Sequence, residues 1–574
     1  MDYKEIYTKW RTNNFFDEAT RNELASIEKD EKEIEDRFYK DLEFGTAGLR
    51  GKLGAGTNRM NMYIISRATQ GLADYIKSQG KSYMDRGVAI AYDCRHFSKE
   101  FAKRAALVLA ANNVKAYLFE SLRPTPLLSF TVRHLKTASG IVVTASHNPK
   151  EYNGYKVYWE DGAQIGQELA DAITENILKI DNFEDVKVMD EKEALDKGLL
   201  TILGSEIDDI YVSKVKELAL REDIDKDIKV VYTPLNGTGN VLVRRVLRER
   251  GFSNISVVPE QENPDPDFTT APFPNPEDTR AFEYAERLGQ KLEADLLIAT
   301  DPDCDRLAIM VRNRDGKYVS FNGNQTGAML VKYIVEARKE LGKLPTNGFI
   351  VKSIVTGNLG KAISEKYGVK AFESLTGFKN ICGKANELEK TGDYKFVFGY
   401  EESIGYVTGD FVKDKDGVIS SMMLCEAAAY YKNQGKNLID VLEETYKEFG
   451  YYREKQISLV LEGIEGSKRI SRMMEVYRKE YPTEIKGVKL TQYADYKYSK
   501  EVDIIAGSET KSDIPASNVL KFTLEDGSWY AVRPSGTEPK IKIYLYSKAD
   551  NNKAAEEKIS SMEEVVLSKL HSVK

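Results

Sequence analysis

The first residue in this chain whose type and setting suggest chemistry is a serine that follows a short apolar run. Ile141-Val-Val143 is typical of a buried strand, and it ends in the small and polar residues Thr144-Ala-Ser-His-Asn-Pro149. Ligands gather at loops that leave the carboxyl ends of strands in an open α/β sheet, so Ser146 and His147 are expected at the edge of a binding site. A polar turn that caps a helix would have the same composition, and this segment alone does not separate the two interpretations.

A second loop carries an unusual concentration of negative charge. Asp301, Asp303 and Asp305 alternate between two apolar runs, which predicts a strand, a tight acidic loop and a returning strand. Alternate residues of an extended segment project to one side, so the three carboxylates are expected to converge and to need a cation. Oxygen ligands suit Mg²⁺, or Mn²⁺, better than zinc. A calcium loop of the EF-hand type is excluded, because Arg306 and Arg312 stand where it requires Gly and Glu. A solvated acidic turn remains the alternative.

Two further loops offer groups that suit sugars and phosphates. Phe398-Gly-Tyr-Glu-Glu-Ser-Ile-Gly-Tyr406 follows a strand-like segment and presents carboxylates and a hydroxyl for hydrogen bonds. Arg533-Pro-Ser-Gly-Thr-Glu-Pro539 lies between two apolar segments, and its arginine provides a two-pronged donor for phosphate. Glycine turns that carry a charge are common, so neither loop is decisive by itself.

Composition agrees with a large folded protein. A length of 574 residues suggests about four domains, and 41% hydrophobic with 30% charged residues is typical of globular chains. The net charge of −7 argues against a nucleic-acid partner. No apolar stretch approaches the roughly 20 residues of a membrane span, and the first residues lack a signal-peptide pattern. The four cysteines are scattered, as expected for reduced thiols, so we predict a cytoplasmic protein with no membrane partner.

The order of apolar runs predicts consecutive α/β units. A strand at Gly87–Ala91, a helix through 101–110 and a strand at Ala116–Phe119 give a βαβ rhythm. The first 43 residues are charged with periodic apolar positions, which indicates helices ahead of the first domain. The proline-rich segment 264–276 must be a loop, ordered on the surface. Composition shifts place the domains at 1–205, 206–320, 321–447 and 448–574.

Taken together and in this order, the loops carry a family resemblance. The chain resembles the α-D-phosphohexomutases, the phosphoglucomutase and phosphomannomutase superfamily, from about Phe44 to about Leu545. The segments similar to family signatures are Phe44-Gly-Thr-Ala-Gly-Leu-Arg50, Thr144–Pro149, Asp301-Pro-Asp-Cys-Asp-Arg306, Thr376-Gly-Phe-Lys379, Glu401-Glu-Ser403 and Arg533-Pro-Ser-Gly-Thr537. The Glu-Glu-Ser form is closer to the phosphoglucomutases and phosphopentomutases than to the phosphomannomutases, whose loop usually runs Glu-Met-Ser-Gly-His. Here Tyr406 ends the segment and histidine is absent from it.

The resemblance implies a fold and an activity. The expected fold is an α/β, four-domain architecture, with three related βαβ mixed-sheet domains and a smaller C-terminal α+β domain around a central cleft. The expected enzyme is an isomerase, a phosphoglucomutase that interconverts α-D-glucose 1-phosphate and glucose 6-phosphate through a phosphoserine enzyme. Glucose 1,6-bisphosphate would be its intermediate and activator, with one Mg²⁺ per chain. A phosphopentomutase, a phosphomannomutase or a sugar-phosphate-binding protein without mutase activity are the alternatives, and the protein would be a monomer or a homodimer.

The resemblance also implies roles for individual residues. The catalytic set is Ser146, His147, Lys156 and Arg306, and the metal set is Ser146, Asp301, Asp303 and Asp305. The substrate set is Arg50, Thr376, Glu401, Ser403, Lys415, Arg533, Ser535 and Thr537. Lys156 would be either a general acid/base, which needs surroundings that lower its pKa, or an electrostatic support. His147 would either hydrogen-bond near the phosphoryl group or serve the structure of its loop.

Overall fold

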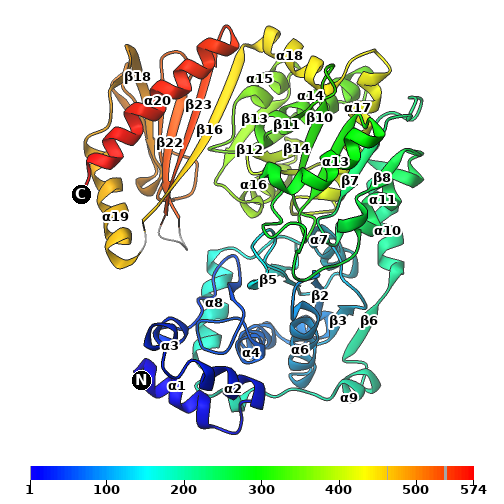
Figure 1. Cartoon of the computed structure of the whole chain (residues 1–574), viewed down its shortest axis with the longest axis vertical. Helices are drawn as coiled ribbons and strands as arrows, with labels where there is room; N and C mark the ends of the chain where they lie inside the picture. The colour runs from blue at the N-terminus through cyan, green and yellow to red at the C-terminus, as the bar shows by residue number, and fades with distance from the viewer. Residues whose placement is uncertain (1, 462, 536–539) are drawn as a thin grey trace. The chain divides into compact units, whose positions relative to one another are not determined.

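A computed structural model describes residues 2–461, 463–535 and 540–574, and these residues form two compact units (Figure 1). The first unit contains Met1–Asn322 and Ser403–Asn437, and the second contains Gly323–Glu402 and Leu438–Lys574. Within the described residues, none of the helices combines the length and the hydrophobicity that a membrane span requires.

The first sheet of the first unit carries the serine loop. Its strands lie in the order β1-β5-β4-β2-β3-β6. Strands β4, β2, β3 and β6 run parallel to one another, and β5 runs antiparallel to both of its neighbours, β4 and β1. The strands are β1 (Leu49–Lys52), β2 (Val88–Tyr92), β3 (Ala116–Phe119), β4 (Ser139–Val143), β5 (Tyr152–Trp159) and β6 (Leu200–Leu203). The helices of this part are α4 (Met62–Ser78), α5 (Lys81–Arg86), α6 (Ser98–Ala111), α7 (Thr125–Leu135), α8 (Gln167–Leu178) and α9 (Glu191–Asp196), with a 3-10 turn, η1 (Phe183–Asp185). Every residue of β2 and β4 is buried, as expected for strands covered on both faces.

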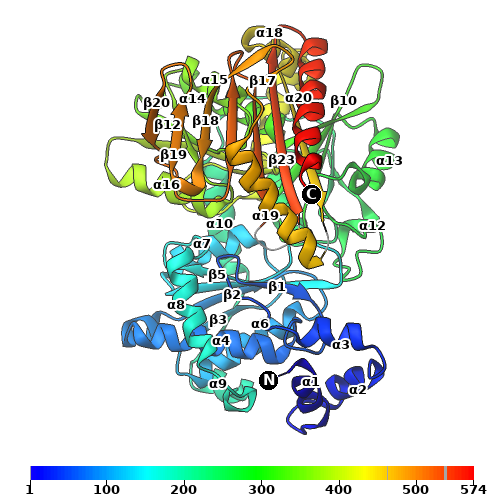
Figure 2. The same cartoon turned by 90° about the vertical axis from the view of Figure 1, so that its left-hand side faces the viewer.

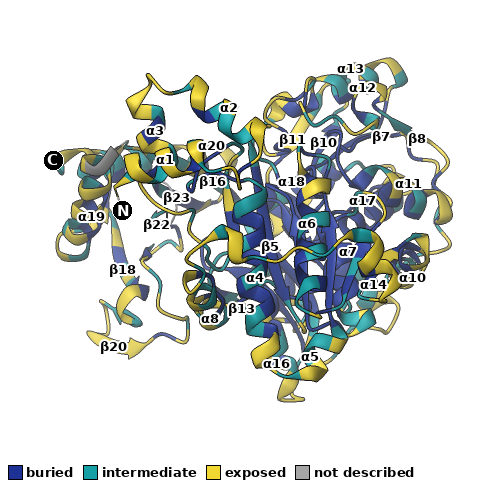
Figure 3. Ribbon diagram, turned by 90° about the horizontal axis from the view of Figure 1, so that it is seen from below, coloured by how far each residue is buried: buried dark blue, intermediate teal, exposed yellow. Residues whose placement is uncertain are grey.

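The second sheet of the first unit carries the acidic loop. Its strand order is β11-β10-β9-β7-β8, and the acidic loop connects the antiparallel pair β9 and β10. The strands are β7 (Val230–Thr233), β8 (Ile255–Val257), β9 (Leu296–Thr300), β10 (Leu307–Arg312) and β11 (Tyr318–Phe321). The remaining elements are α10 (Ser205–Glu217), α11 (Gly239–Glu249), α12 (Pro259–Glu262), η2 (Thr279–Phe282), α13 (Glu283–Leu292), β15 (Gly405–Val407) and α17 (Gly417–Lys432). In Figure 3 buried residues are dark blue: β7, β9 and all but the last residue of β10 are buried, whereas β8 is intermediate and β11 is mostly intermediate or exposed.

The second unit begins with a small parallel sheet in which β12 pairs with both β13 and β14. The elements are α14 (Gly323–Glu340), β12 (Gly348–Ser353), α15 (Leu359–Lys366), β13 (Lys370–Ser374), α16 (Phe378–Lys390), β14 (Lys395–Glu401) and α18 (Leu438–Phe449). The carboxyl ends of these parallel strands lead to Ser353, Ser374 and Glu401.

An antiparallel sheet completes the second unit, in the order β16-β23-β22-β21-β18-β19-β20 with β17 beside β18. Helices α19 and α20 both pack on it (Figure 2), and their apolar side chains share one core with the inward-facing residues of the strands. The strands are β16 (Tyr451–Val460), β17 (Glu484–Ile485), β18 (Val488–Asp495), β19 (Lys500–Asp503), β20 (Ser508–Lys511), β21 (Leu520–Leu524), β22 (Trp529–Pro534) and β23 (Lys540–Ala549). The helices are α19 (Gly463–Lys479), η3 (Tyr496–Tyr498) and α20 (Asn552–Ser572).

Three N-terminal helices form a separate aromatic core in the first unit. They are α1 (Tyr3–Thr12), α2 (Glu18–Ser26) and α3 (Glu31–Phe38). Trp10 is 2% exposed, stacks on Phe16 with ring centroids 4.3 Å apart, and meets Phe38 and Phe183 edge to face. The predicted N-terminal helices are therefore confirmed, and a large aromatic side chain holds them together.

We expect Trp10→Ala to lower the free energy of unfolding of this region by about 3–5 kcal/mol, because the removed indole leaves a cavity in a closed aromatic cluster. Urea unfolding, followed together with amide exchange of α1–α3, measures the effect. Val241→Ala is the matched control, since Val241 is 67% exposed and its truncation should cost under about 0.5 kcal/mol. Equal effects of the two substitutions would contradict this assignment of the core.

Candidate active site

Ser146 occupies a strained position directly after β4. Its φ is +53°, a left-handed conformation that non-glycine residues seldom adopt. The side chain is buried, and Oγ lies 2.7 Å from Asp301 Oδ2 and 3.2 Å from His147 Nδ1. The hydroxyl is thus aimed at the acidic loop, as the predicted placement of Ser146 requires.

A buried ion pair holds the serine loop in this shape. The guanidinium of Arg95 donates hydrogen bonds to the backbone carbonyls of Ser146, Asn148, Pro149 and Tyr152. Its Nε lies 3.2 Å from Asp93 Oδ2, and both side chains are wholly buried. Asp93 also accepts from Thr144 Oγ1 at 2.6 Å. Arg95 therefore neutralises a buried carboxylate and satisfies a run of loop carbonyls that would otherwise lack donors.

Sequence analysis missed this pair. Asp93-Cys-Arg95 follows the apolar strand β2, next to β4 in the sheet, so it leaves the same edge as the serine loop. Two opposite charges directly after a fully apolar strand were the available signal.

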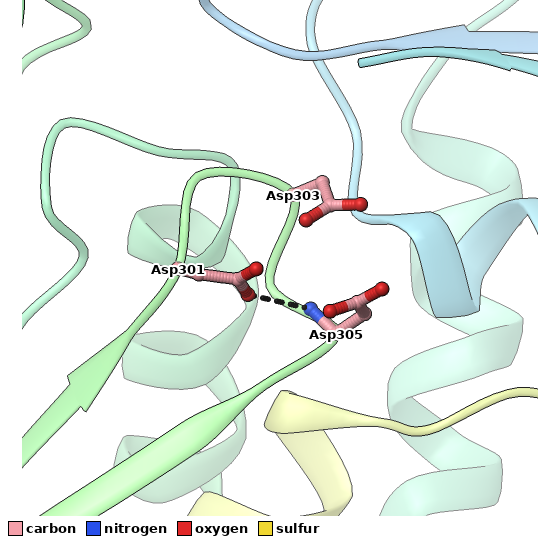
Figure 4. Close-up of side chains that lie close together, drawn as sticks. All are labelled: Asp301, Asp303 and Asp305. Atoms are coloured by element: carbon pink, nitrogen blue, oxygen red, sulfur yellow. Dashed lines mark hydrogen bonds between the residues drawn. The ribbon is translucent and has the colours of Figure 1, made fainter. Parts of the chain in front are cut away.

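The three aspartates converge, as predicted (Figure 4). Asp301, Asp303 and Asp305 are buried, and one carboxylate oxygen from each lies within 4.8 Å of the others. The prediction that an extended segment brings the three carboxylates together is wrong. The loop is a turn rather than an extended segment, with Cys304 at φ +52° and the amides of Asp305 and Arg306 both donating to Asp301 Oδ1, at 3.1 and 2.9 Å.

Cationic side chains surround the acidic loop. Lys156 Nζ lies 2.7 Å from Asp303 Oδ2 and 3.4 Å from Asp305 Oδ2. Lys415 Nζ lies 2.8 Å from Asp305 Oδ2, and Arg306 Nε lies 3.8 Å from Asp305 Oδ1. Lys156 is thus placed at the acidic loop, and Lys415, which the resemblance assigns to substrate, is also held there by an ion pair.

The pKa shifts record the balance of burial and charge. Burial, together with the Asp305 and Asp303 carboxylates, raises the pKa of Asp301 well above its usual range. Burial also opposes ionisation of Asp303, but Lys156 and Lys415 outweigh it and lower its pKa. Burial and the Arg306 guanidinium lower the pKa of His147 well below the usual range, so its ring is neutral at pH 7.

The acidic loop is compatible with a hard divalent cation. Asp303 Oδ1 and Asp305 Oδ1 are buried and have no hydrogen-bond partner among the described residues. Buried carboxylate oxygens without donors are costly, and a metal ion satisfies them. An all-oxygen donor set suits Mg²⁺ or Mn²⁺. The buried triad could therefore hold such an ion.

Close backbone packing fixes the acidic loop. The amide of Gly417, the first residue of α17, donates to Cys304 O at 3.0 Å, and a Cβ built at Gly417 would lie 2.8 Å from that oxygen. On the other side a Cβ at Gly237 would lie 2.5 Å from Pro302 Cα. Real Cβ atoms do not approach this closely, so both positions require glycine.

Burial and the neighbouring Asp416 raise the pKa of the Cys304 thiol, which argues against a reactive thiolate at this position.

Arg50 and Ser403 are the other predicted site residues of the first unit. Arg50 lies on β1, and its Nη1 reaches Asn148 Oδ1 of the serine loop at 3.5 Å. Ser403 directly follows the end of β14 and is half-buried.

The predicted sugar loop begins on a strand, because β14 extends to Glu401. Glu401 is buried and accepts from the Gly377 amide at 3.2 Å, so it joins the segment that contains Thr376. Glu402 accepts from Ser353 Oγ and Thr356 Oγ1, both at 2.9 Å. Two signatures distant in sequence thus meet within the second unit.

Arg533 lies on β22, which ends at Pro534, and Ser535 directly follows that strand. Arg533 is half-buried, and the Ser535 amide donates to Lys540 O at 2.8 Å. Burial and Glu402 raise the pKa of the Tyr544 hydroxyl, whereas Arg533 acts in the opposite direction. Thr537, the last predicted residue of this loop, lies outside the described residues.

A buried lysine in the second unit escaped sequence analysis. Lys352, on β12, is 0% exposed and donates to Glu373 Oε1 at 2.7 Å and to Thr356 O at 2.9 Å. Burial lowers its pKa to about 8. A charged residue inside an otherwise apolar parallel strand was the signal for it.

Comparisons with known proteins identify the family. Four domains of one protein family match the chain in order. They are phosphoglucomutase/phosphomannomutase alpha/beta/alpha domain I over residues 41–184, domain II over 209–316, domain III over 322–449, and the C-terminal domain over 486–560. The chain belongs to the phosphoglucomutase/phosphomannomutase family. It is therefore an isomerase with the four-domain α/β architecture of that family, and the predicted family, fold and enzyme class are confirmed.

The relatives agree with this conclusion. A protein named phosphoglucomutase from Staphylococcus haemolyticus is 38% identical over 90% of this chain and 92% of its own. One of the same name from Staphylococcus aureus is 37% identical over 93% and 94%. The parafusin structure from Paramecium shares the fold, with a TM-score of 0.68 at 17% identity over 93% of this chain and 95% of its own.

We expect Asp303→Asn to weaken Mg²⁺ or Mn²⁺ binding by at least about tenfold, because it replaces an anionic ligand with a neutral one and leaves the loop's shape unchanged. Isothermal titration with the metal alone measures this affinity. Asp416→Asn is the control: Asp416 is equally buried, but it caps α17 by accepting from the Val418 and Ile419 amides, which asparagine also does. Identical affinities in the two variants would rule out the triad as the metal site.

Proposed function

We propose that this protein is a phosphoglucomutase, which interconverts α-D-glucose 1-phosphate and glucose 6-phosphate through a phosphorylated Ser146. The observation that supports this most strongly is the 2.7 Å contact of Ser146 Oγ with a buried triad of carboxylates. A hydroxyl so placed can carry a phosphoryl group whose charge a divalent cation and lysines offset. The relatives named phosphoglucomutase, 37–38% identical over most of the chain, support the choice of sugar.

The proposed reaction has two half-reactions. In the first, the P–O bond to Ser146 Oγ breaks as phosphorus bonds to O6 of glucose 1-phosphate; the O6 hydroxyl loses its proton to a base and Ser146 Oγ takes up a proton. The product is glucose 1,6-bisphosphate, which reorients. In the second, Ser146 Oγ loses its proton and bonds to the phosphorus on O1, and O1 takes up a proton as its bond to phosphorus breaks. Glucose 6-phosphate leaves, and the phosphoserine is restored.

Residues of the first unit would bind the metal ion and neutralise the charge of the phosphoryl group. Asp301, Asp303 and Asp305 would hold Mg²⁺, together with the phosphate on Ser146. When bound, the ion supplies Lewis-acid stabilisation of the phosphoryl oxygens. Lys156 and Lys415 are already fixed at the triad by ion pairs, so they can neutralise charge without rearranging.

His147 and Lys156 are the candidates for moving the proton. His147 Nδ1 lies 3.2 Å from Ser146 Oγ, and its ring is neutral at pH 7, which is the form that hydrogen-bonds without adding charge. Lys156 is ion-paired with Asp303 and Asp305, which holds its side chain at the triad, where it can support charge or donate a proton. Arg306, directly after the triad, adds a cation from the acidic loop itself.

The family resemblance assigns further residues to the sugar hydroxyls and to the second phosphate. Thr376 and Glu401 of the second unit and Ser403 of the first would bind sugar hydroxyls, and Arg533, Ser535 and Thr537 would bind the phosphate that is not being transferred. Arginine suits this task because it can pair with two phosphate oxygens at once. Glucose 1,6-bisphosphate would also act as the activator that rephosphorylates Ser146.

Replacement of the nucleophile is the direct test. We expect Ser146→Ala to lose mutase turnover by several orders of magnitude while the fold persists, since the loop is held by carbonyl and amide contacts rather than by the hydroxyl. Intact-mass measurement of the wild type should show a species about 80 Da heavier, the mass of an added phosphate group, and the variant should lack it. Ser129→Ala, which removes another buried hydroxyl, is the control. Wild-type turnover in Ser146→Ala would exclude the mechanism.

The phosphate grip gives a second test. We expect Arg533→Ala to raise KM for glucose 1-phosphate by roughly 30-fold or more, because loss of a charge-assisted pair costs at least about 2 kcal/mol. Steady-state kinetics with and without added glucose 1,6-bisphosphate measure it. Lys553→Ala removes an exposed cation from the same part of the chain and should leave KM unchanged.

Measurement of kcat/KM for glucose, mannose, ribose and deoxyribose 1-phosphates tests the choice of sugar. A higher kcat/KM for another sugar would replace glucose in this proposal.

A further inference from the structure

The proline-rich loop between α12 and η2 lies against the serine loop, although neither the motifs nor the proposed mechanism uses it. The ring of Phe268 stacks on the guanidinium of Arg95, 4.9 Å from ring centroid to Cζ, and Phe268 is 0% exposed. Phe273 meets the His147 ring edge to face at 6.3 Å. Asp267 pairs with Lys150, 3.0 Å away and just beyond the serine loop. We call residues 263–275 the strap.

The strap is built to present Phe268. Asp265 accepts through its side chain from the amides of Asp267 and Thr269, both at 2.9 Å, and through its carbonyl from the Phe268 amide. Phe268 itself has a φ of +47°, a conformation that non-glycine residues adopt only when their surroundings fix it. The prolines at 264, 266, 272, 274 and 276 limit the backbone further. The ring is therefore held on Arg95 by a preorganised turn.

One short segment connects the strap to the acidic loop. Asn236 Nδ2 donates to Asn263 O at 2.7 Å, and Leu235 packs with Ala271 of the strap. Two residues further on, the Thr238 amide donates to Pro302 O at 2.8 Å, inside the acidic loop. The segment 235–238 thus touches the strap and the acidic loop together.

We propose that the strap is a positioning element, and that Phe268 is its key residue: it holds Arg95, and through Arg95 the carbonyls of the serine loop, in register with the acidic loop. Arg95 is the only link in this path that touches Ser146, so Phe268 acts through another residue and is not catalytic. An aromatic face over a buried guanidinium restrains that group and keeps water from its hydrogen bonds. This inference rests on the proposed role of Ser146.

The test compares Phe268→Leu with Phe252→Leu. Both remove a buried phenyl ring from the same part of the chain, but Phe252 lies just after α11 and outside the strap. We expect Phe268→Leu to lower kcat by roughly 10- to 100-fold, as a displaced reacting group does, with KM changed by less than about twofold. Phe268→Tyr keeps the aromatic face and should recover most of the loss. Phe252→Leu should leave kcat near wild type.

Hydrogen exchange provides a readout that does not depend on turnover. Amides of 144–152 should exchange about tenfold faster in Phe268→Leu than in Phe252→Leu, while β2 and β9 stay equally protected in both. Equal exchange and equal kcat in the two variants would overturn the proposal, and so would a loss of protection spread evenly over the first unit. A wild type without phosphoserine or turnover would instead refute the proposed function, and the exchange comparison would still decide whether the strap holds the loop.

Discussion

Mutual repulsion among three buried carboxylates is the constraint on which the rest of the first unit depends. Asp301, Asp303 and Asp305 converge and are buried, so their charge must be opposed from outside the loop. Lys156 comes from β5 of the first sheet and Lys415 from the segment before α17. The charges of the acidic loop are therefore balanced only when three separate segments of the chain pack against one another. Formation of the site thus depends on correct packing of the first unit.

Backbone strain is the second cost of this arrangement. Ser146, Cys304 and Phe268 all adopt left-handed conformations, and each lies in or against a loop of the proposed transfer centre. Their surroundings compensate: Arg95 satisfies the carbonyls after Ser146, and Gly417 brings the amide of α17 onto Cys304 O. Rigid loops of this kind suit phosphoryl transfer, where catalysis is mainly positioning and charge neutralisation.

Local sequence predicted the elements better than it predicted their connections. The strands β3, β4 and β9 and the helix α6 were visible as apolar runs, because burial on both faces leaves no other composition. Ser146 and the three aspartates were visible as polar residues at strand ends. Arg95, Lys352 and Phe268 were not, since each matters through a partner more than 20 residues away, and one sequence contains no record of that pairing.

The two units hold different parts of the proposed chemistry. The first contains Ser146, which we propose is phosphorylated, and the charges that would offset its phosphate, whereas the second contains Glu401, Arg533 and the buried Lys352. A bisphosphate that must turn around needs a grip that is the same in both orientations and a transfer centre that does not change between them. In the proposed mechanism, the rigid loops around Ser146 would meet the second requirement, and Arg533, bound to whichever phosphate is not transferred, would meet the first. In the proposed mechanism, Arg533 would release its phosphate while the strained serine loop stays unchanged.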